Sequence, residues 1–319
     1  MPGLTAMVAL VFTWMSVQQT RTEMRIAEQG QITGRFNDAV GHLGAGSMEM
    51  RLGGIYALQR IMQDSSRDQP AIVVVLSAYV RDKAHVPKGG FVKETGDRDE
   101  QAEIEPPDDV YAAVYVLNGQ PPRGGEQVAV DLGSADLRGL ALDGRRDYLR
   151  LKLPNGDPSL RDSGSGFRFA RLDGADLRRV SFDQVDLRGV TLHGANLSGA
   201  FIHRSDLRGA QLWDTDLTKA ELTGSLLSGA SFTGATLREA KLFESRITEA
   251  DFTAADLKNA GLNDADLTGA VLYGADLSGA DLTGANLREA NLTGANLSKA
   301  RLSGAKLDGV RGLPASMRH

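Results

Sequence analysis

Residues 280–290 read Ala-Asp-Leu-Thr-Gly-Ala-Asn-Leu-Arg-Glu-Ala, and this stretch contains two copies of a five-residue pattern. From Leu172 to Leu307 every fifth residue is Leu, Phe or Ile, which makes 28 consecutive positions. Two residues before each of these positions stands a small or β-branched residue, most often Ala. A short, fixed period of this kind is typical of a repeat architecture.

A period of five excludes a long helix and a long strand. On a helix, five steps advance the chain by about 140°, so the Leu positions would spiral around the surface. In a strand the side chains alternate with a period of two, and because five is odd, the Leu positions of a long strand would fall on both faces. Within one repeat, however, Ala and Leu are two residues apart, so both can point to the same side of a short strand. The remaining residues, often including Gly, must then turn the chain. The sequence therefore predicts short strands and corners that stack as a coil.

The pattern A-(D/N)-L-x-x over residues 167–310 resembles that of the pentapeptide-repeat family. The resemblance implies a mainly β fold, namely a right-handed quadrilateral β-helix with four repeats in each coil. Residues 20 apart in the sequence would then share a face of the rod, and the 28 repeats would form seven coils.

The candidate partner-binding residues are aromatic and acidic side chains that this register places at the surface. On one predicted face Trp213 and Tyr273 stand in line with His193, and aromatic side chains often anchor interfaces. Asp side chains recur in one column of another predicted face. The candidates are Trp213, Tyr273, Phe243, Asp216, Asp256 and Asp276.

The acidic residues admit two interpretations. Between Asp214 and Asp281 there are 12 acidic and 5 basic residues, a net charge of −7. Some pentapeptide-repeat proteins imitate DNA and bind type II topoisomerases, so the resemblance makes a gyrase-binding protein one alternative. In the other interpretation, Asp and Asn belong to the repeat itself, because short polar side chains hydrogen-bond to nearby backbone at turns.

Residues 1–20 contain no charged side chain, and Leu4 to Val17 is strongly apolar. We predict a membrane-anchor helix over residues 1–20, although its apolar length is marginal for a span. Arg21, Arg25 and Arg35 follow it and would hold the rest of the chain in the cytoplasm by the positive-inside rule. The expected location is thus the cell membrane, single-pass, with the repeats on the cytoplasmic side. A buried or interfacial helix is the alternative.

Residues 21–85 are predicted to form a helical module. Apolar stripes include Ala39 with Leu43 and Ile55 with Leu58, and Pro70 suits the first turn of a third helix. Val73 to Val75 could equally form a buried strand. Residues 30–44 and 51–84 resemble a module found ahead of pentapeptide repeats in bacterial proteins, often behind a membrane segment. That resemblance implies no activity.

Four further segments complete the predicted organisation. Residues 86–107 are charged and contain Pro and Gly, so we expect a flexible linker. Residues 108–166 are predicted to be the N-terminal cap and an irregular first coil of the solenoid, with a short helix over 108–118 that covers its open end. The β-helix then occupies 167–310, and residues 311–319 form a tail. Because no cap is evident beyond Val310, a homodimer through the last coil is possible.

Composition excludes several kinds of activity. The chain has no Cys, which removes thiol nucleophiles and thiolate metal sites. Its five His residues form no metal-spaced pair, and no P-loop or nucleophile elbow occurs. With 36 basic and 41 acidic residues, direct nucleic-acid binding is not expected.

We therefore expect no metal, no cofactor and no enzymatic activity. The predicted function is a non-enzymatic, membrane-anchored scaffold or protein-interaction module whose protein partner is unknown. A third alternative is an enzyme or ligand-binding protein with a site between the helical module and the rod.

Overall fold

The structure, a computed structural model, describes residues 2–86, 105–119, 128–143 and 167–313, with residues 2–11 described by their backbone alone. The chain forms two compact units that divide between Ile72 and Val73. This division falls inside a helix and not in the linker predicted over 86–107, most of which lies outside the described residues. The helical segment predicted over 21–85 is therefore shared between the two units.

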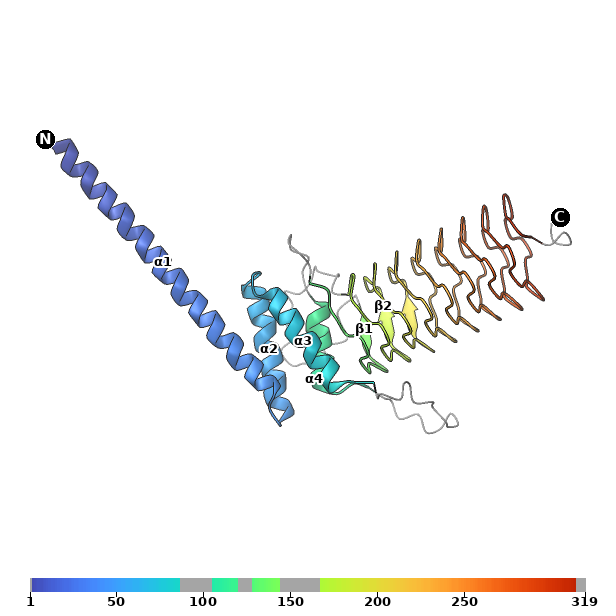
Figure 1. Cartoon of the computed structure of the whole chain (residues 1–319), viewed down its shortest axis with the longest axis horizontal. Coiled ribbons are helices and arrows are strands. Elements are labelled where there is room, and N and C mark those ends of the chain that lie inside the picture. The colour runs from blue at the N-terminus through green and yellow to red at the C-terminus, as the bar shows by residue number, and fades with distance from the viewer. Residues whose placement is uncertain (1, 87–104, 120–127, 144–166, 314–319) are drawn as a thin grey trace. The chain divides into compact units, whose positions relative to one another are not determined.

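The first unit begins with one long helix, α1 (Pro2–Leu43), which runs for 42 residues without a break (Figure 1). The predicted boundary between residues 20 and 21 thus lies inside a continuous helix. Near its C-terminal end Ala39 and Leu43 are buried, as the apolar stripe predicts. Among the described residues, the structure contains no helix with both the length and the apolar character needed to cross a membrane. A spanning helix over residues 1–20 is therefore not supported.

Helix α2 (Met48–Asp64) packs against α1 through a glycine. The helix begins after Ser47, whose Oγ accepts a hydrogen bond of 3.2 Å from the backbone N–H of Met50. A Cβ atom on Gly54 would lie 2.7 Å from the carbonyl oxygen of Ala39 in α1. Ile55 and Leu58 are fully buried beside it. The absence of a side chain at residue 54 is what allows the two backbones to approach.

Helix α3 (Gln69–Lys83) resolves the ambiguity at Val73 to Val75 in favour of a helix. Its second half belongs to the second unit, where it is joined to the first coil of the repeats. The backbone N–H of Asp131 donates to Ser77 Oγ (3.3 Å), and Arg81 Nη1 lies 3.2 Å from the Asp131 carboxylate. After the helix, Val86 N donates to the carbonyl oxygen of Ser134 (2.9 Å).

Helix α4 (Asp108–Asn118) has the predicted bounds and lies in the second unit, together with the repeats. Its apolar side chains are buried, and Tyr111 donates a hydrogen bond to the carbonyl oxygen of Ala141 in the first coil. Tyr79 of α3 donates to the buried carboxylate of Asp109 at 2.5 Å. Helices α3 and α4 are thereby tied to each other and to the end of the solenoid, which would otherwise expose apolar surface.

The repeats form a stack of coils with the predicted 20-residue register (Figure 1). Parallel β-bridges join each coil to the next on all four sides, so residues 171–310 make seven coils. Longer strands occur only in the first coils among the described residues, as β1 (Ala141–Asp143), β2 (Ser181–Asp183) and β3 (Phe201–His203). The column of Leu, Ile and Phe side chains fills the core, where Phe232 and Phe252 stack at 4.7 Å between ring centroids.

Each corner of a coil requires a residue in the left-handed region. Gly224 and Gly229 have φ of 66°, and Glu239 and Glu244 occupy equivalent corners at 57° and 58°. Gly adopts this conformation without a Cβ penalty, which explains why it recurs in the last position of so many repeats.

The first coil contains an insertion that leaves the register intact. Its residues form β-bridges with residues 40 positions later in the sequence, which is twice the normal spacing of 20. Asp131 pairs in this way with Arg171, and Ala141 with Ser181. From Arg171 onward, every pair is a single coil length apart. One extra coil length of sequence therefore stands between β1 and Phe167. Residues 144–166, the last part of the predicted irregular first coil, lie outside the described residues.

The last coil exposes part of the core. Leu302 and Leu307 point inward like their predecessors but are only partly buried, whereas Leu282 and Leu287 one coil earlier are fully buried. The homodimer through this end of the rod stays a prediction.

Four hydroxyl side chains replace Ala in the inward column: Ser205, Thr215, Ser225 and Ser245. At most corners the N–H of this residue bonds to the carbonyl oxygen three residues earlier, as for Ala210 and Leu207 (3.0 Å). At the corners after β2 and β3, the N–H groups of Val185 and Ser205 instead donate to the hydroxyl of the next coil, on Ser205 (3.1 Å) and Ser225 (3.2 Å). These two serines therefore complete the backbone hydrogen bonding.

We predict that Gly54→Ala destabilises the first unit, because the new Cβ atom collides with the backbone of α1. Overpacking of this kind costs about 1–3 kcal/mol. Gly53→Ala is the matched control, since Gly53 is exposed and a Cβ atom there would have no neighbour within 4 Å. The control should stabilise the helix by about 0.5–1 kcal/mol. Chemical denaturation followed by circular dichroism measures both, and equal shifts would contradict the close approach.

We also predict that Ser225→Ala destabilises the solenoid by about 1–3 kcal/mol, since it leaves the buried N–H of Ser205 without an acceptor. Ser245→Ala is the control: Ser245 only donates to the carbonyl oxygen of Leu222 (2.7 Å), which also accepts from Ser225 N. Its replacement by the usual Ala should cost under about 1 kcal/mol. Thermal unfolding of the two variants should differ in midpoint; identical midpoints would show that the serines are interchangeable.

Candidate functional site

The register defines four outward faces, each made by four-residue segments that recur once in every coil. Face 1 comprises residues 191–194, 211–214, 231–234, 251–254, 271–274 and 291–294. Faces 2, 3 and 4 begin five, ten and fifteen residues later in each coil. In every segment the second side chain enters the core, while the first and third point away from it.

Face 1 differs from the other three in charge. From residue 191 onward its six segments contain two charged residues, Asp214 and Asp251, and the preceding coil adds Arg171 and Asp173. Over the same six coils face 2 carries 8 charged residues, face 3 carries 7 and face 4 carries 9. Face 1 also carries the exposed Trp213 and Tyr273. It is therefore the aromatic side of the rod and the side with the fewest charged residues.

Trp213 is held in place by its neighbours while its surface stays accessible. Its indole ring stacks on His193 with 4.5 Å between ring centroids and an interplanar angle of 32°. The indole Nε1–H donates to Ser231 Oγ at 2.6 Å, one coil further along. The backbone N–H of His193 donates to the Asp173 carboxylate at 3.0 Å. Trp213 is therefore an exposed side chain (44%) whose orientation is fixed by contacts within the rod.

Tyr273 lies three coils beyond Trp213, a separation of about 14 Å at the usual strand spacing. It is 54% exposed. Between the two rings the face presents Thr233, Thr253 and the Asp251 carboxylate, which accepts from Thr253 N at 2.8 Å. The surface between the aromatic side chains is thus polar but almost uncharged.

The acidic candidates lie on face 2 and are engaged in contacts within the rod. Asp216 Oδ1 accepts from the backbone N–H of Thr218 at 2.9 Å. Asp256 pairs with Arg238 at 2.6 Å, and Asp276 lies 3.0 Å from Lys258 Nζ. The backbone N–H groups of Lys258 and Ser278 also donate to Asp256 and Asp276, at 3.2 and 3.0 Å. These backbone contacts support the interpretation that the Asp side chains belong to the turn of the repeat.

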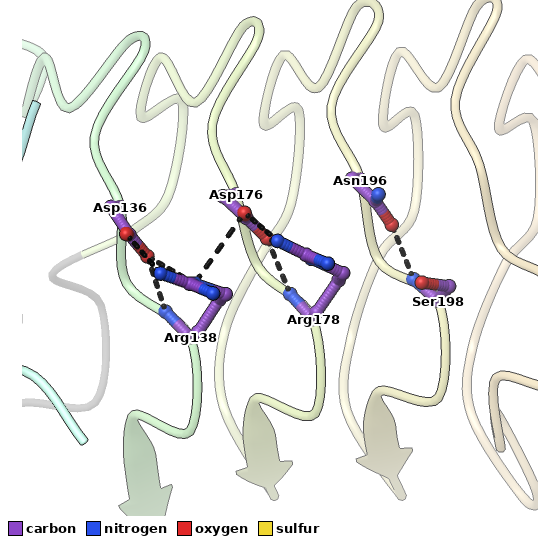
Figure 2. A network of polar contacts seen from close by, with 6 residues as sticks. All are labelled: Asp136, Arg138, Asp176, Arg178, Asn196 and Ser198. Carbon is purple, nitrogen blue, oxygen red and sulfur yellow. Dashed lines mark hydrogen bonds and ion pairs between the residues drawn. The ribbon is translucent and has the colours of Figure 1, made fainter. Parts of the chain in front are cut away.

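The same face carries a buried polar network at its N-terminal end (Figure 2). Its residues are Asp136, Arg138, Asp176, Arg178, Asn196 and Ser198. Each Asp-Leu-Arg segment forms a two-pronged pair: Arg178 Nε and Nη2 donate to the two carboxylate oxygens of Asp176 at 2.8 and 2.6 Å. Arg138 Nε lies 3.6 Å from Asp176 and links one coil to the next. The charges of this network are matched internally.

Face 4 repeats this arrangement with Asp186, Arg188, Asp206 and Arg208. Partial burial by itself would raise the pKa of Asp206, but hydrogen bonds from Arg208 and the nearby charge of Arg188 outweigh it, so the pKa is lowered. Hydrogen bonding to Asp186 raises the pKa of Arg188. Both charged states are thereby favoured in the folded rod.

The structure brings together only some of the predicted residues. Trp213 and Tyr273 share face 1, as expected, together with His193. Phe243 lies on face 3, two repeats away, in line with His203 and Thr223. Sequence reasoning missed the contribution of Asp173 and Ser231, which position His193 and Trp213. Their spacing of about one coil from the aromatic residues is the signal that could have identified them.

No catalytic arrangement emerges from the described part of the chain. Within those ranges no three His, Asp or Glu side chains gather where they could hold a metal ion. His193 lies on face 1 and His203 on face 3, where its Nε2 is 3.4 Å from Glu221. The two histidines therefore cannot act in one site.

The sequence and its register identify the class of protein. The family model for Pentapeptide repeats matches eight copies, in residues 167–204, 205–242, 245–284 and 275–311. The chain belongs to the pentapeptide-repeat family.

Several solved structures resemble the chain. A pentapeptide repeat protein (Rfr23) from the cyanobacterium Cyanothece 51142 is 30% identical, covering 35% of this chain and 90% of that one, with a TM-score of 0.34. HetL from Nostoc sp. strain PCC 7120, a protein involved in heterocyst differentiation regulation, is 29% identical, with coverages of 56% and 84% and a TM-score of 0.26. QnrB1, a plasmid-mediated fluoroquinolone resistance protein, is 19% identical, with coverages of 55% and 90% and a TM-score of 0.32. No curated protein matches the chain.

We predict that acid weakens the rod because several carboxylates have lowered pKa values. Burial opposes the shift at Asp276, but hydrogen bonds from Ser278 and from the Lys258 ammonium lower its pKa. Hydrogen bonding from Thr283 lowers the pKa of Asp281, and hydrogen bonding from Lys241 lowers that of Glu221. A lowered folded-state pKa gives stability that is present above the unfolded value of about 4 and is lost as the pH falls through the folded value.

The variant Asp276→Asn tests this cause. Asn296 occupies the same column and accepts from the N–H of Ser298 at 3.1 Å, so an amide preserves the turn while removing the titrating group. The denaturation midpoint of the variant should fall less between pH 7 and pH 3 than that of the native chain. An equal fall in both proteins would show that Asp276 does not contribute.

Proposed function

We propose that the chain is a non-enzymatic protein-interaction module that binds its partner through face 1. The observation that carries this proposal is the sparsely charged, aromatic strip with Trp213 and Tyr273 on a rod whose other faces carry many more charges. The centres of protein interfaces are depleted of charged residues and enriched in Trp and Tyr. Face 1 has both properties.

Desolvation explains why the other faces are poorer candidates. A partner that covers face 2 or face 4 must remove water from pairs such as Asp256 with Arg238 and Asp206 with Arg208. Burying a charged pair costs free energy that the pair itself does not always return. On face 1 the polar groups are mostly hydroxyls, whose burial costs less provided that each finds a hydrogen bond.

The size of face 1 indicates a transient contact. Six coils at about 4.8 Å and a side about 10 Å wide give an area of about 300 Å². A stable complex usually buries about 800 Å² on each partner. The partner therefore either binds weakly or reaches over the corners onto the neighbouring faces.

The contacts of the acidic side chains do not favour the alternative of a DNA-mimicking, gyrase-binding protein. Such a surface needs unneutralised negative charge that extends along the rod. Asp256 and Asp276 lie beside Lys or Arg, and the Asp-Leu-Arg segments of faces 2 and 4 are paired internally. The excess of acid between Asp214 and Asp281 is divided among all four sides.

A photo-crosslinking residue tests the proposal directly. Placed at Thr253 on face 1 it should capture a protein partner that the same residue at Thr223, on face 3, does not capture. Tyr273→Ala should reduce capture about tenfold, as expected for an aromatic anchor worth more than about 1 kcal/mol. Phe201→Ala is the matched control, because Phe201 is also an exposed aromatic residue (43%) but lies on face 3. Capture that is equal at both positions, or insensitive to Tyr273→Ala, would contradict the proposal.

A further inference from the structure

The described side chains in the N-terminal half of α1 are exposed. Every described residue from 12 to 31 is exposed, and burial begins only where the helix meets α2, at Ala39 and Leu43. The exposed stretch nevertheless contains large apolar side chains. Phe12 is 69% exposed, Trp14 62% and Met15 57%. Contiguous apolar surface of this kind marks a binding site or a membrane contact.

The arrangement of these side chains around the helix indicates whether a second helix or a lipid bilayer covers them. At about 100° per residue, Trp14, Met15 and Val17 lie about 200°, 300° and 140° around the axis from Phe12. The apolar residues thus span an arc of about 220°, and Thr13 and Ser16 occupy the remaining sector of about 140°. A second helix covers a stripe of about 100°, which is narrower than this arc, whereas lipid tails reach every side of an inserted helix. The distribution favours a bilayer over a second copy of the chain.

Charge and length give the depth of the contact. No charged residue occurs before Arg21, and the apolar sequence extends back to Leu4. Residues 4–17 make a helix about 21 Å long, which is shorter than the hydrocarbon core of about 30 Å. Trp14 lies near the polar end of the segment, where its ring suits the membrane interface. Arg21 and Arg25, one turn apart, follow at the level expected for lipid headgroups.

We propose that residues 4–17 of α1 insert into the hydrocarbon core of a membrane without reaching its far side, with Arg21 and Arg25 at the headgroups of anionic lipids. Insertion of this kind attaches the chain to the membrane without crossing it. Basic side chains next to an inserted segment favour the anionic cytoplasmic leaflet. The attachment uses the first unit and is independent of the binding proposed for face 1.

Vesicle flotation of the full chain tests the insertion. The chain should float with vesicles of phosphatidylcholine and phosphatidylglycerol, and more weakly with phosphatidylcholine alone. Phe12→Glu with Met15→Glu should reduce the bound fraction at least tenfold. Val74→Glu is the control, since Val74 is 56% exposed on α3, outside this segment, and should leave binding unchanged. Arg21→Glu with Arg25→Glu should remove the preference for anionic vesicles and retain binding to neutral ones.

Fluorescence locates the contact within the chain. The protein has two Trp residues, so the Trp213→Phe variant reports on Trp14 alone. Its emission should shift to the blue on addition of vesicles. Absence of flotation at saturating lipid, or unchanged binding of the Phe12→Glu, Met15→Glu variant, would overturn the proposal. So would a concentration-dependent oligomer that this variant abolishes while the native chain ignores vesicles, because a second copy would then cover the helix.

Discussion

The hydrogen bonds between successive coils are the constraint on which the rest of the repeat domain depends. Leu227 N donates to the carbonyl oxygen of Arg246 in the next coil at 2.7 Å, and Arg246 N returns a bond to Ser225 at 3.0 Å. This exchange works only if successive coils are equal in length, since a residue added within a side would move the Leu side chain out of the core. The left-handed corners follow from the same requirement. A non-glycine corner such as Glu239 costs about 1–2 kcal/mol, and the surrounding bonds hold it in place.

Once the register is fixed, each outward position becomes a column along the rod. The columns explain why Asp-Leu-Arg recurs near the N-terminal end of the repeats. In each copy the Arg folds back onto the Asp two residues earlier, as Arg188 does on Asp186 at 2.8 Å. The carboxylate also accepts from the backbone N–H of the same Arg at 3.2 Å. A charged pair that is satisfied within one short segment can be repeated from coil to coil without disturbing the stack.

The sequence predicts this part of the fold well because the core position repeats without exception. The 20-residue register, the faces of Trp213 and Phe243 and the bounds of α4 all follow from local patterns. The course of α1 does not. Gly30 and Gly34 weaken a helix locally but do not end it, so the sequence contains no signal for continuity from residue 2 to residue 43. The division of the two units inside α3 could not be predicted from local patterns either. It depends on contacts of Ser77 and Arg81 with Asp131, which is about 50 residues away in the sequence.

The candidate site was predicted only in part for a related physical reason. A column of Asp residues looks acidic when it is counted alone, but the next column of the same face carries Arg238 and Lys258, which pair with Asp256 and Asp276. When the charges of neighbouring coils are counted together, the Asp column is no longer a strongly acidic surface. Faces 2 and 4 carry paired charges that remain solvated by water, and face 1 carries few charges. A rigid rod cannot rearrange its backbone to pair new charges with a partner. The face with fewest charges to desolvate is therefore the one that a protein can cover at least cost.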